Sequence, residues 1–205
     1  MLSKVISAGE LTLGQIIDEH CRARQATTTI KAKFTQTKVF TLFEESEISR
    51  GTLFFARPNR ICWQYSEPDK SITVINDEVG WSVFPHIKQV QKFKLDGSKT
   101  NKILSIIGFG MCGAPLKDYF DIELGEEINK VYLLLLKPTD SDITPYFSQI
   151  ELSLHRSDFL PREIVLHEKS GDLLRFNFTG LERNKKLDES VFELAVPDGY
   201  EVVEY

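Results

Sequence analysis

The chain has 205 residues, of which 41% are hydrophobic and 27% are charged. This composition is typical of a folded globular protein and lies far from the low-hydrophobicity, high-charge composition of disordered chains. The formal net charge is -5 and no dense run of lysine and arginine occurs, so the sequence lacks the basic surface that nucleic-acid binding needs. We expect one domain over residues 1–205 and no nucleic-acid partner.

The sequence shows neither the pattern of a transmembrane helix nor that of a secretory signal peptide. No stretch approaches the roughly 20 apolar residues that a helix needs to cross a bilayer. Residues 1–8 are too short, and too interrupted by Ser3 and Lys4, to hold the apolar core of about 7 to 15 residues of a secretory signal. We expect either a cytoplasmic protein or a mature chain whose signal peptide has been removed.

The first expected element is a helix that begins after Thr12. Thr12 with Gln15 three residues later is a capping-box pattern, and Ile16 and Ile17 fall on one apolar face of the helix. From Thr27 onward the apolar residues recur at every second position, as in a half-buried strand. The sequence therefore predicts one amphipathic helix followed by sheet.

Segments with a period of two, separated by turn residues, continue over most of the chain. Strands are expected at 27–37, 51–56, 61–65, 71–75, 80–84 and 89–95, and again at 131–136, 146–154, 160–167 and 173–178. A loop is expected around Glu44–Glu47 and a turn at Arg57–Asn59. The first six strands have no helix between them, which favours an antiparallel meander over a parallel α/β fold. We expect a mainly β fold with one curved antiparallel sheet of about eleven strands.

Residues 103–111 are apolar on almost every side and differ from the strands around them. A helix of one or two turns would place Ile103, Ile106 and Ile107 on one face and leave little polar surface, so the segment must be covered. The glycines at positions 108, 110 and 113 suit hinges or ordinary helix ends. With a second short helix expected at 116–119, this segment predicts a helical lid on the sheet.

No arrangement of residues typical of an active site occurs in the sequence. It has no G-x-S-x-G, P-loop, H-E-x-x-H or dinucleotide-binding pattern. The four histidines are scattered; His155 and His167 could face each other on neighbouring strands, but such pairs are usually structural. We expect no enzyme, no catalytic residue, no metal site and no cofactor.

The three cysteines also match no known metal or redox pattern. Cys21, Cys62 and Cys112 fit neither a zinc ribbon nor a C-x-x-C pair, and their odd number leaves at least one thiol outside any internal disulfide. Spacing alone does not show whether two of them are bonded. Buried free thiols are the favoured interpretation.

The first six strands hold more large apolar residues than a small closed core needs. These residues are Phe34, Phe40, Phe43, Leu53, Phe54, Phe55, Trp63, Tyr65, Trp81, Phe84 and Phe93. They can pack against the helices, or they can line a concave pocket on a half-closed sheet. The pattern by itself leaves both interpretations open.

Several motifs in this region occur together in one known family. They are Phe34–Gln36 (F-x-Q), Gly51–Trp63 (G-x-L-x-F-x-R-P-N-x-x-x-W), Tyr65 with the Pro68–Asp69 turn, and Trp81 before Lys88–Val90. In this order and spacing they resemble the periplasmic outer-membrane lipoprotein carrier family, LolA. The resemblance covers most of residues 10–125 and is weaker beyond. The extra carboxyl-terminal strand and loop of well-studied carriers are not recognised in residues 190–205.

The resemblance implies a fold and a mechanism. It implies an incomplete, half-open antiparallel β-barrel of eleven strands covered by short helices, with lipoprotein acyl chains held inside. It also matches Arg57 to the arginine that hydrogen-bonds the backbone of the lid, although the residues alone favour a surface arginine at a turn. A guanidinium offers five donors to carbonyl groups left unpaired at helix ends. When the cleft is empty, we expect the lid to fill it and Arg57 to hold the lid closed.

The expected cleft and lid residues are Phe34, Leu53, Phe55, Arg57, Trp63, Trp81, Ile103, Ile106, Ile107 and Phe109. The expected ligands are lipoprotein acyl chains or another lipid, and the resemblance implies an inner-membrane release complex and an outer-membrane acceptor as partners. We expect a monomer in the periplasm. The alternative is a domain of the same fold that senses lipids or lipoproteins in a regulatory pathway.

Overall fold

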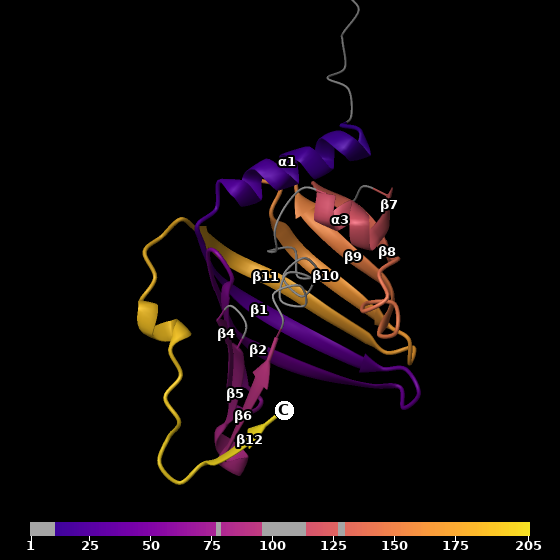
Figure 1. Cartoon of the computed structure of the whole chain (residues 1–205). Helices are drawn as coiled ribbons and strands as arrows, with labels where there is room; N and C mark the ends of the chain where they lie inside the picture. Colours follow the sequence, from indigo (N-terminus) through magenta and orange to yellow (C-terminus); the bar gives the residue numbers. More distant parts are fainter. Residues whose placement is uncertain (1–10, 77–78, 96–113, 127–129) are drawn as a thin grey trace, which may run out of the picture.

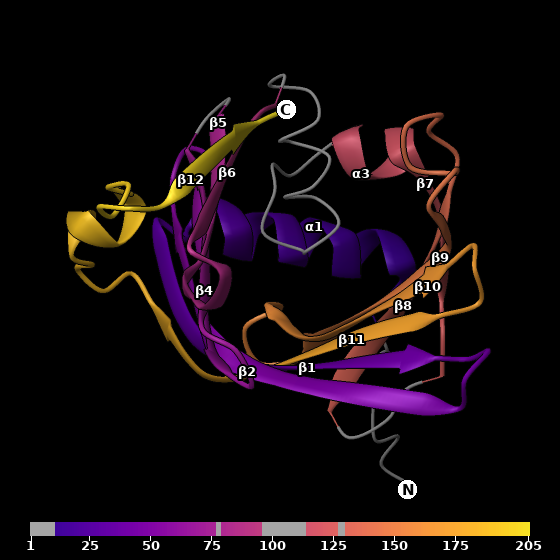
Figure 2. The same ribbon diagram turned by 90° about the horizontal axis from the view of Figure 1, so that it is seen from below.

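Twelve strands form one sheet that curves without closing in the part of the chain that the structure describes (Figures 1 and 2). The structure is a computed structural model and describes residues 11–76, 79–95, 114–126 and 130–205. The strands are Thr29–Phe40 (β1), Glu45–Ala56 (β2), Arg60–Glu67 (β3), Ser71–Asn76 (β4), Val79–Phe84 (β5), Gln89–Lys94 (β6), Phe120–Leu124 (β7), Val131–Pro138 (β8), Phe147–His155 (β9), Pro161–Glu168 (β10), Leu173–Arg183 (β11) and Glu201–Glu204 (β12). The fold class expected from the sequence, a half-open and mainly β structure, is confirmed.

Two meanders make up the sheet, and they meet at β1. The strand order is β12-β6-β5-β4-β3-β2-β1-β11-β10-β9-β8-β7, so β1 to β6 and β7 to β11 each run consecutively and β1 pairs with β11. All neighbouring strands are antiparallel except β12, which is parallel to β6. Figure 2 shows the sheet as a trough with β4 to β6 and β12 in one wall and β8 to β10 in the other.

Three expectations about the strands need correction. The tail does contain a further strand, β12, which was not recognised because it is only four residues long. The edge strand β7 was also missed. The acidic residues around Glu45 lie in β2 and not in a loop, because β1 and β2 stay paired as far as Phe40 and Glu45. This end of the hairpin is exposed, so its strand residues are polar and give no period-two signal.

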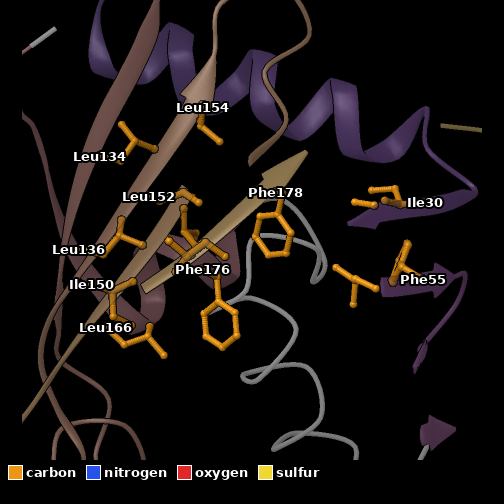
Figure 3. Close-up of a cluster of buried hydrophobic side chains, with 14 of the residues drawn as sticks. Ile30, Phe55, Leu134, Leu136, Ile150, Leu152, Leu154, Leu166, Phe176 and Phe178 are labelled. Carbon is orange, nitrogen blue, oxygen red and sulfur yellow. The ribbon is translucent and has the colours of Figure 1, made fainter. Parts of the chain in front are cut away.

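Most buried strand residues line the concave side of the sheet, although β2, β3 and β10 bury residues of both faces. In β1, Ile30, Ala32 and Phe34 are buried while Lys31 and Lys33 between them are not, as the alternation of side chains in a strand requires. Many buried side chains of this core come from β8 to β11, and Ile30 and Phe55 of the other half belong to the same cluster (Figure 3). The main core is therefore the lining of the trough.

A 13-residue helix, Leu13–Gln25 (α1), covers one end of the trough (Figures 1 and 2). Its capping box is as predicted, with Thr12 at the N-cap and Gln15 bonding back to the Thr12 backbone. Ile16 and Ile17 are buried in the main core. The expected second short helix is Ala114–Tyr119 (α3), next to β7. The expected lid segment 103–111 lies outside the described residues.

A second, smaller apolar cluster lies on the convex side of β2 to β4. Phe54, Cys62 and Val74 pack there against Phe192 from the short 3-10 helix Glu189–Phe192 (η2). The guanidinium of Arg60 lies over the Phe192 ring, 4.8 Å from its centroid, where a cation is attracted by the ring. The carboxyl-terminal segment therefore covers the outer face of this wall.

A second 3-10 helix, Pro85–Ile87 (η1), joins β5 to β6. None of the helices in the described ranges has the length and apolar character to cross a bilayer.

Candidate functional site

Five aromatic rings gather at the base of the trough. They are Phe34 of β1, Trp63 and Tyr65 of β3, and Phe176 and Phe178 of β11, and we call them the aromatic floor. The Phe34 ring meets Trp63 and Tyr65 edge to face, with centroid distances of 4.8 and 4.9 Å, and Trp63 lies 5.2 Å from Phe176. These are favourable aromatic geometries.

The backbone of β2 makes room for this floor. Gly51 stands opposite both Phe34 and Tyr65 in the sheet. A Cβ atom at Gly51 would lie 2.7 Å from Cζ of Phe34 and 2.1 Å from the carbonyl oxygen of Gln64. Any larger residue there would push the Phe34 ring and the strand apart, so the glycine of the sequence motif has a packing reason.

The floor is only partly covered by the protein. Phe34, Phe176 and Phe178 are buried, but Trp63 and Tyr65 stay half-buried. The Tyr65 hydroxyl donates a hydrogen bond of 2.5 Å to Oε1 of Gln36, and burial raises the pKa of Tyr65 to about 12. The floor therefore presents apolar ring surface and no ionised group.

Apart from Arg57, the cleft and lid residues expected from the sequence fall into three groups. Phe34, Leu53, Phe55 and Trp63 come together on the concave side, where Leu53 and Phe55 are packed into the core. Trp81 does not join them, because it lies opposite Val74 of the convex cluster and has Lys92 Nζ 5.1 Å from its ring centroid. The lid residues Ile103, Ile106, Ile107 and Phe109 lie outside the described residues.

Arg57 holds the carboxyl-terminal end of α1. Its Nε donates to the carbonyl of Thr27 at 2.7 Å and its Nη2 donates to the carbonyl of Arg24 at 2.8 Å. Carbonyl groups in the last turn of a helix lack a partner within the helix. The planar guanidinium binds one of them, that of Arg24, together with the carbonyl of Thr27 just after the C-cap Ala26. The turn between β2 and β3 is thereby tied to α1. The predicted contact of Arg57 with the segment 103–111 falls outside the described residues and stays a prediction.

His20 ties the same helix to the opposite half of the sheet, and no pattern in the sequence indicated this contact. Its Nδ1 lies 2.7 Å from the carbonyl oxygen of Phe159, in the loop between β9 and β10. Since a carbonyl only accepts, Nδ1 carries a proton, and the neutral state of the ring follows from its lowered pKa. Burial, with a smaller contribution from the charge of Arg24, lowers the pKa of His20 from 6.5 to about 3. The contact joins residues that are 139 positions apart, so no local pattern in the sequence shows it.

A cavity of about 290 Å³ lies between α1 and the free edge of the sheet at β7. Its lining consists of Leu13, Gly14, Ile17, Lys117, Phe120, Asp121 and Ile122. Apolar side chains from α1 and β7 form its walls, and one lysine and one aspartate add charge. Its volume is at the lower end of the range of small-molecule sites, roughly 300 to 1,000 Å³. Sequence reasoning missed this cavity because β7 was not expected.

The histidines and thiols show no catalytic arrangement within the described ranges. His155 and His167 occupy positions of β9 and β10 that do not face each other, and His167 instead contacts Glu151 at 2.7 Å. Cys21 and Cys62 are free thiols, and Cys112 lies outside the described residues. Burial raises the pKa of Cys62 to about 12, which keeps it an unreactive thiol. No group of three or more metal-binding side chains occurs among the residues that the structure covers.

Comparison with known proteins gives the family. The sequence profile of the family described as outer membrane lipoprotein carrier protein LolA matches residues 25–195. The chain belongs to the LolA family. The match extends well past residue 125, where the resemblance seen in the sequence faded, so the second meander belongs to the same family domain.

One curated relative has the same description, and two solved structures share the fold. An outer-membrane lipoprotein carrier protein of Nitrosospira multiformis is 25% identical over 175 residues, which cover 85% of this chain and 82% of the relative. An uncharacterized conserved protein from Thermus thermophilus has a similar structure, with a TM-score of 0.61 and 15% identity, and the match covers 95% of this chain and all of the other. A chain from the structure of the Pseudomonas aeruginosa MucA/MucB complex matches with a TM-score of 0.52 and 16% identity, over 88% of this chain and 60% of the other.

The attachment of α1 by Arg57 gives a first prediction. Arg57→Leu removes both donors to the carbonyl groups of Thr27 and Arg24, and about 1 kcal/mol is lost for each hydrogen bond. We expect backbone amides of α1 to exchange with deuterium at least about tenfold faster while strand amides keep their rates. The matched control is Arg50→Leu, on the strand β2 that precedes the turn of Arg57, because the Arg50 side chain pairs with Glu67 at the surface. Equal exchange in α1 for both variants would show that Arg57 does not hold the helix.

The neutral His20 gives a second prediction, on pH. The unfolded chain protonates His20 near pH 6.5, whereas the folded chain does so only near pH 3. Stability is therefore lost as the pH falls from about 6.5 toward 3, by up to about 1.4 kcal/mol per pH unit. Denaturant titrations at about pH 7.5 and about pH 5 should show that the wild type loses about 2 kcal/mol more than His20→Gln. His86→Gln, at an exposed position of η1, should behave like the wild type. Parallel losses in the wild type and His20→Gln would contradict the buried neutral ring.

Proposed function

We propose that this protein carries the acyl chains of lipoproteins, or of a related lipid, on the concave side of its sheet and moves them through the periplasm from the inner to the outer membrane. The observation that carries the proposal is the aromatic floor, whose Trp63 and Tyr65 rings stay half-buried inside an open trough. Membership of a family of lipoprotein carriers supports the same function. The chemistry is binding and release, without an enzymatic step.

The hydrophobic effect explains why such a carrier is needed. Each CH₂ group exposed to water costs about 0.8 kcal/mol, so a long acyl chain does not leave a membrane unaided. Aromatic rings and the aliphatic lining of β8 to β11 offer the chain an apolar surface in place of water. The cavity beside α1 and β7 gives room for part of a chain at the apolar wall.

Release must occur without an energy source in this protein, so the bound state should be only moderately favoured over the empty one. We assign the balance to the lid. In the empty protein, Ile103, Ile106, Ile107 and Phe109 would occupy the trough, and the ligand would displace them. The hydrogen bonds of Arg57 to Arg24 of α1 and to Thr27 after the helix are each weak enough to break during loading. An inner-membrane complex would supply the cargo and an outer-membrane acceptor would take it.

Mass spectrometry of the purified protein tests the function. We expect organic extracts of protein isolated from the periplasm of its host to contain acyl lipids or acylated peptides in near-stoichiometric amounts. Phe34→Glu, which puts a charge in the aromatic floor, should come without them, because a buried unpaired carboxylate repels an acyl chain. The matched control is Lys33→Glu, on the neighbouring position of β1 that faces the convex side.

The outcome also separates the two roles that the sequence left open. Bound acyl lipid that depends on Phe34 supports the carrier. A bound peptide without acyl groups would refute the carrier and favour the sensing role. Protein that is free of both in the wild type would contradict the proposed function.

A further inference from the structure

The two walls of the trough differ in polarity on their concave sides. In β8 and β9 the concave residues are aliphatic and fully buried, namely Leu134, Leu136, Ile150, Leu152 and Leu154 (Figure 3). In β4 to β6 the residues that face the trough include Thr73, Ser82 and Gln91 in its middle, with the buried Ile75 and the half-buried Phe84 and Phe93 around them. We call Thr73, Ser82 and Gln91 the polar row.

The sheet register places the polar row next to the aromatic floor. Trp63 is opposite Thr73, Thr73 is opposite Ser82, and Ser82 is opposite Gln91. Directly opposed residues of antiparallel strands project from the same face of a sheet. The polar row therefore continues the line of Trp63 across the wall toward the free edge at β12.

The outer face of this wall is apolar along the same stretch. Val74, Val83 and Val90 alternate with the polar row and are buried, although they face the convex side. Val74 packs there in the cluster around Phe192. An apolar stretch of this wall is thus turned outward and covered by the carboxyl-terminal segment, and the hydrogen-bonding groups of the polar row face the trough.

These groups have hydrogen-bonding capacity beyond their mutual contacts. Ser82 is 8% exposed, and its Oγ lies 2.9 Å from Oγ1 of Thr73. Two hydroxyl groups that share one hydrogen bond leave one proton for another acceptor. Nε2 of Gln91 donates to Oε1 of Gln89 at 2.9 Å, and a carboxamide with one such bond still has a second N–H and a carbonyl. None of these four side chains is ionisable.

We propose that the polar row binds the ester and amide groups that join acyl chains to the head of the ligand. This inference rests on the proposed function and deepens it. Uncharged donors suit carbonyl oxygens of esters and amides, whereas a phosphate or carboxylate would call for a lysine or arginine. The ligand then has one orientation, with its chains over the aromatic floor and the aliphatic wall and its linkage against β4 to β6.

Two probes separate the linkage from the chains. One is a synthetic lipopeptide with ester-linked and amide-linked acyl chains, and the other is diphenylhexatriene, a hydrocarbon dye without hydrogen-bonding groups. The variant is Thr73→Val with Ser82→Ala, which removes both hydroxyl groups with little change of shape. Thr52→Val is the control, because Thr52 is opposite Lys33 and Gln64 on the convex side. Gln91→Leu tests the carboxamide independently.

We expect the double variant to bind the lipopeptide about tenfold more weakly, as for the loss of one or two hydrogen bonds. Its affinity for the hydrocarbon dye should equal that of the wild type, which also shows that the variant is folded. Equal affinity for the lipopeptide in the wild type, the double variant and Gln91→Leu would overturn the polar row and leave the carrier function intact. An equal loss for both probes would also overturn it. A wild type that binds the dye but no lipopeptide would refute the proposed function itself.

Discussion

A sheet that curves without closing leaves its apolar concave face open at both ends, and covering one of these ends is the constraint on which this structure depends. Helix α1 does so by burying Ile16 and Ile17 in the lining of the trough. It is fixed on one side by Arg57, from the β2–β3 turn, and on the other by the contact of His20 with the β9–β10 loop. Among the described strands the two meanders pair only through β1 and β11, and α1 adds a second connection between them above the aromatic floor.

In the proposed complex, the two walls bind different parts of an amphiphilic ligand. The β8–β9 wall is aliphatic on the inside, whereas the β4–β6 wall carries the polar row on the inside and apolar residues on the outside. The second arrangement is stable only because residues of the carboxyl-terminal segment, among them Phe192, cover the outer face. If Val74, Val83 and Val90 faced the trough instead, the core would be larger. The trough would then lack the polar row, and it could hold an acyl chain without orienting it.

Local signals in the sequence predicted most of the fold. The capping box at Thr12 and the alternation in β1 are properties of neighbouring residues, so both could be read directly. Strand β12 was missed because four residues carry too little periodicity. The acidic half of β2 was missed because an exposed hairpin needs no apolar face.

The site was predicted less well than the fold. Alternation shows that two faces differ but not which one is concave, which is why Trp81 was grouped with Trp63. Contacts distant in sequence, such as that of His20 with Phe159, leave no local pattern.

The opposite placement of the two tryptophans allows the most direct test of where an acyl chain binds. Trp63 lies on the aromatic floor, whereas Trp81 lies on the convex side beneath Lys92. A lipid with brominated acyl chains quenches tryptophan fluorescence only at short range. If the acyl chain binds in the trough, the brominated lipid should strongly quench the fluorescence of Trp63, measured in Trp81→Phe. It should quench Trp81, measured in Trp63→Phe, only weakly. Unbrominated lipid is the reference for both variants. Quenching of Trp81 in Trp63→Phe without quenching of Trp63 in Trp81→Phe would contradict binding in the trough.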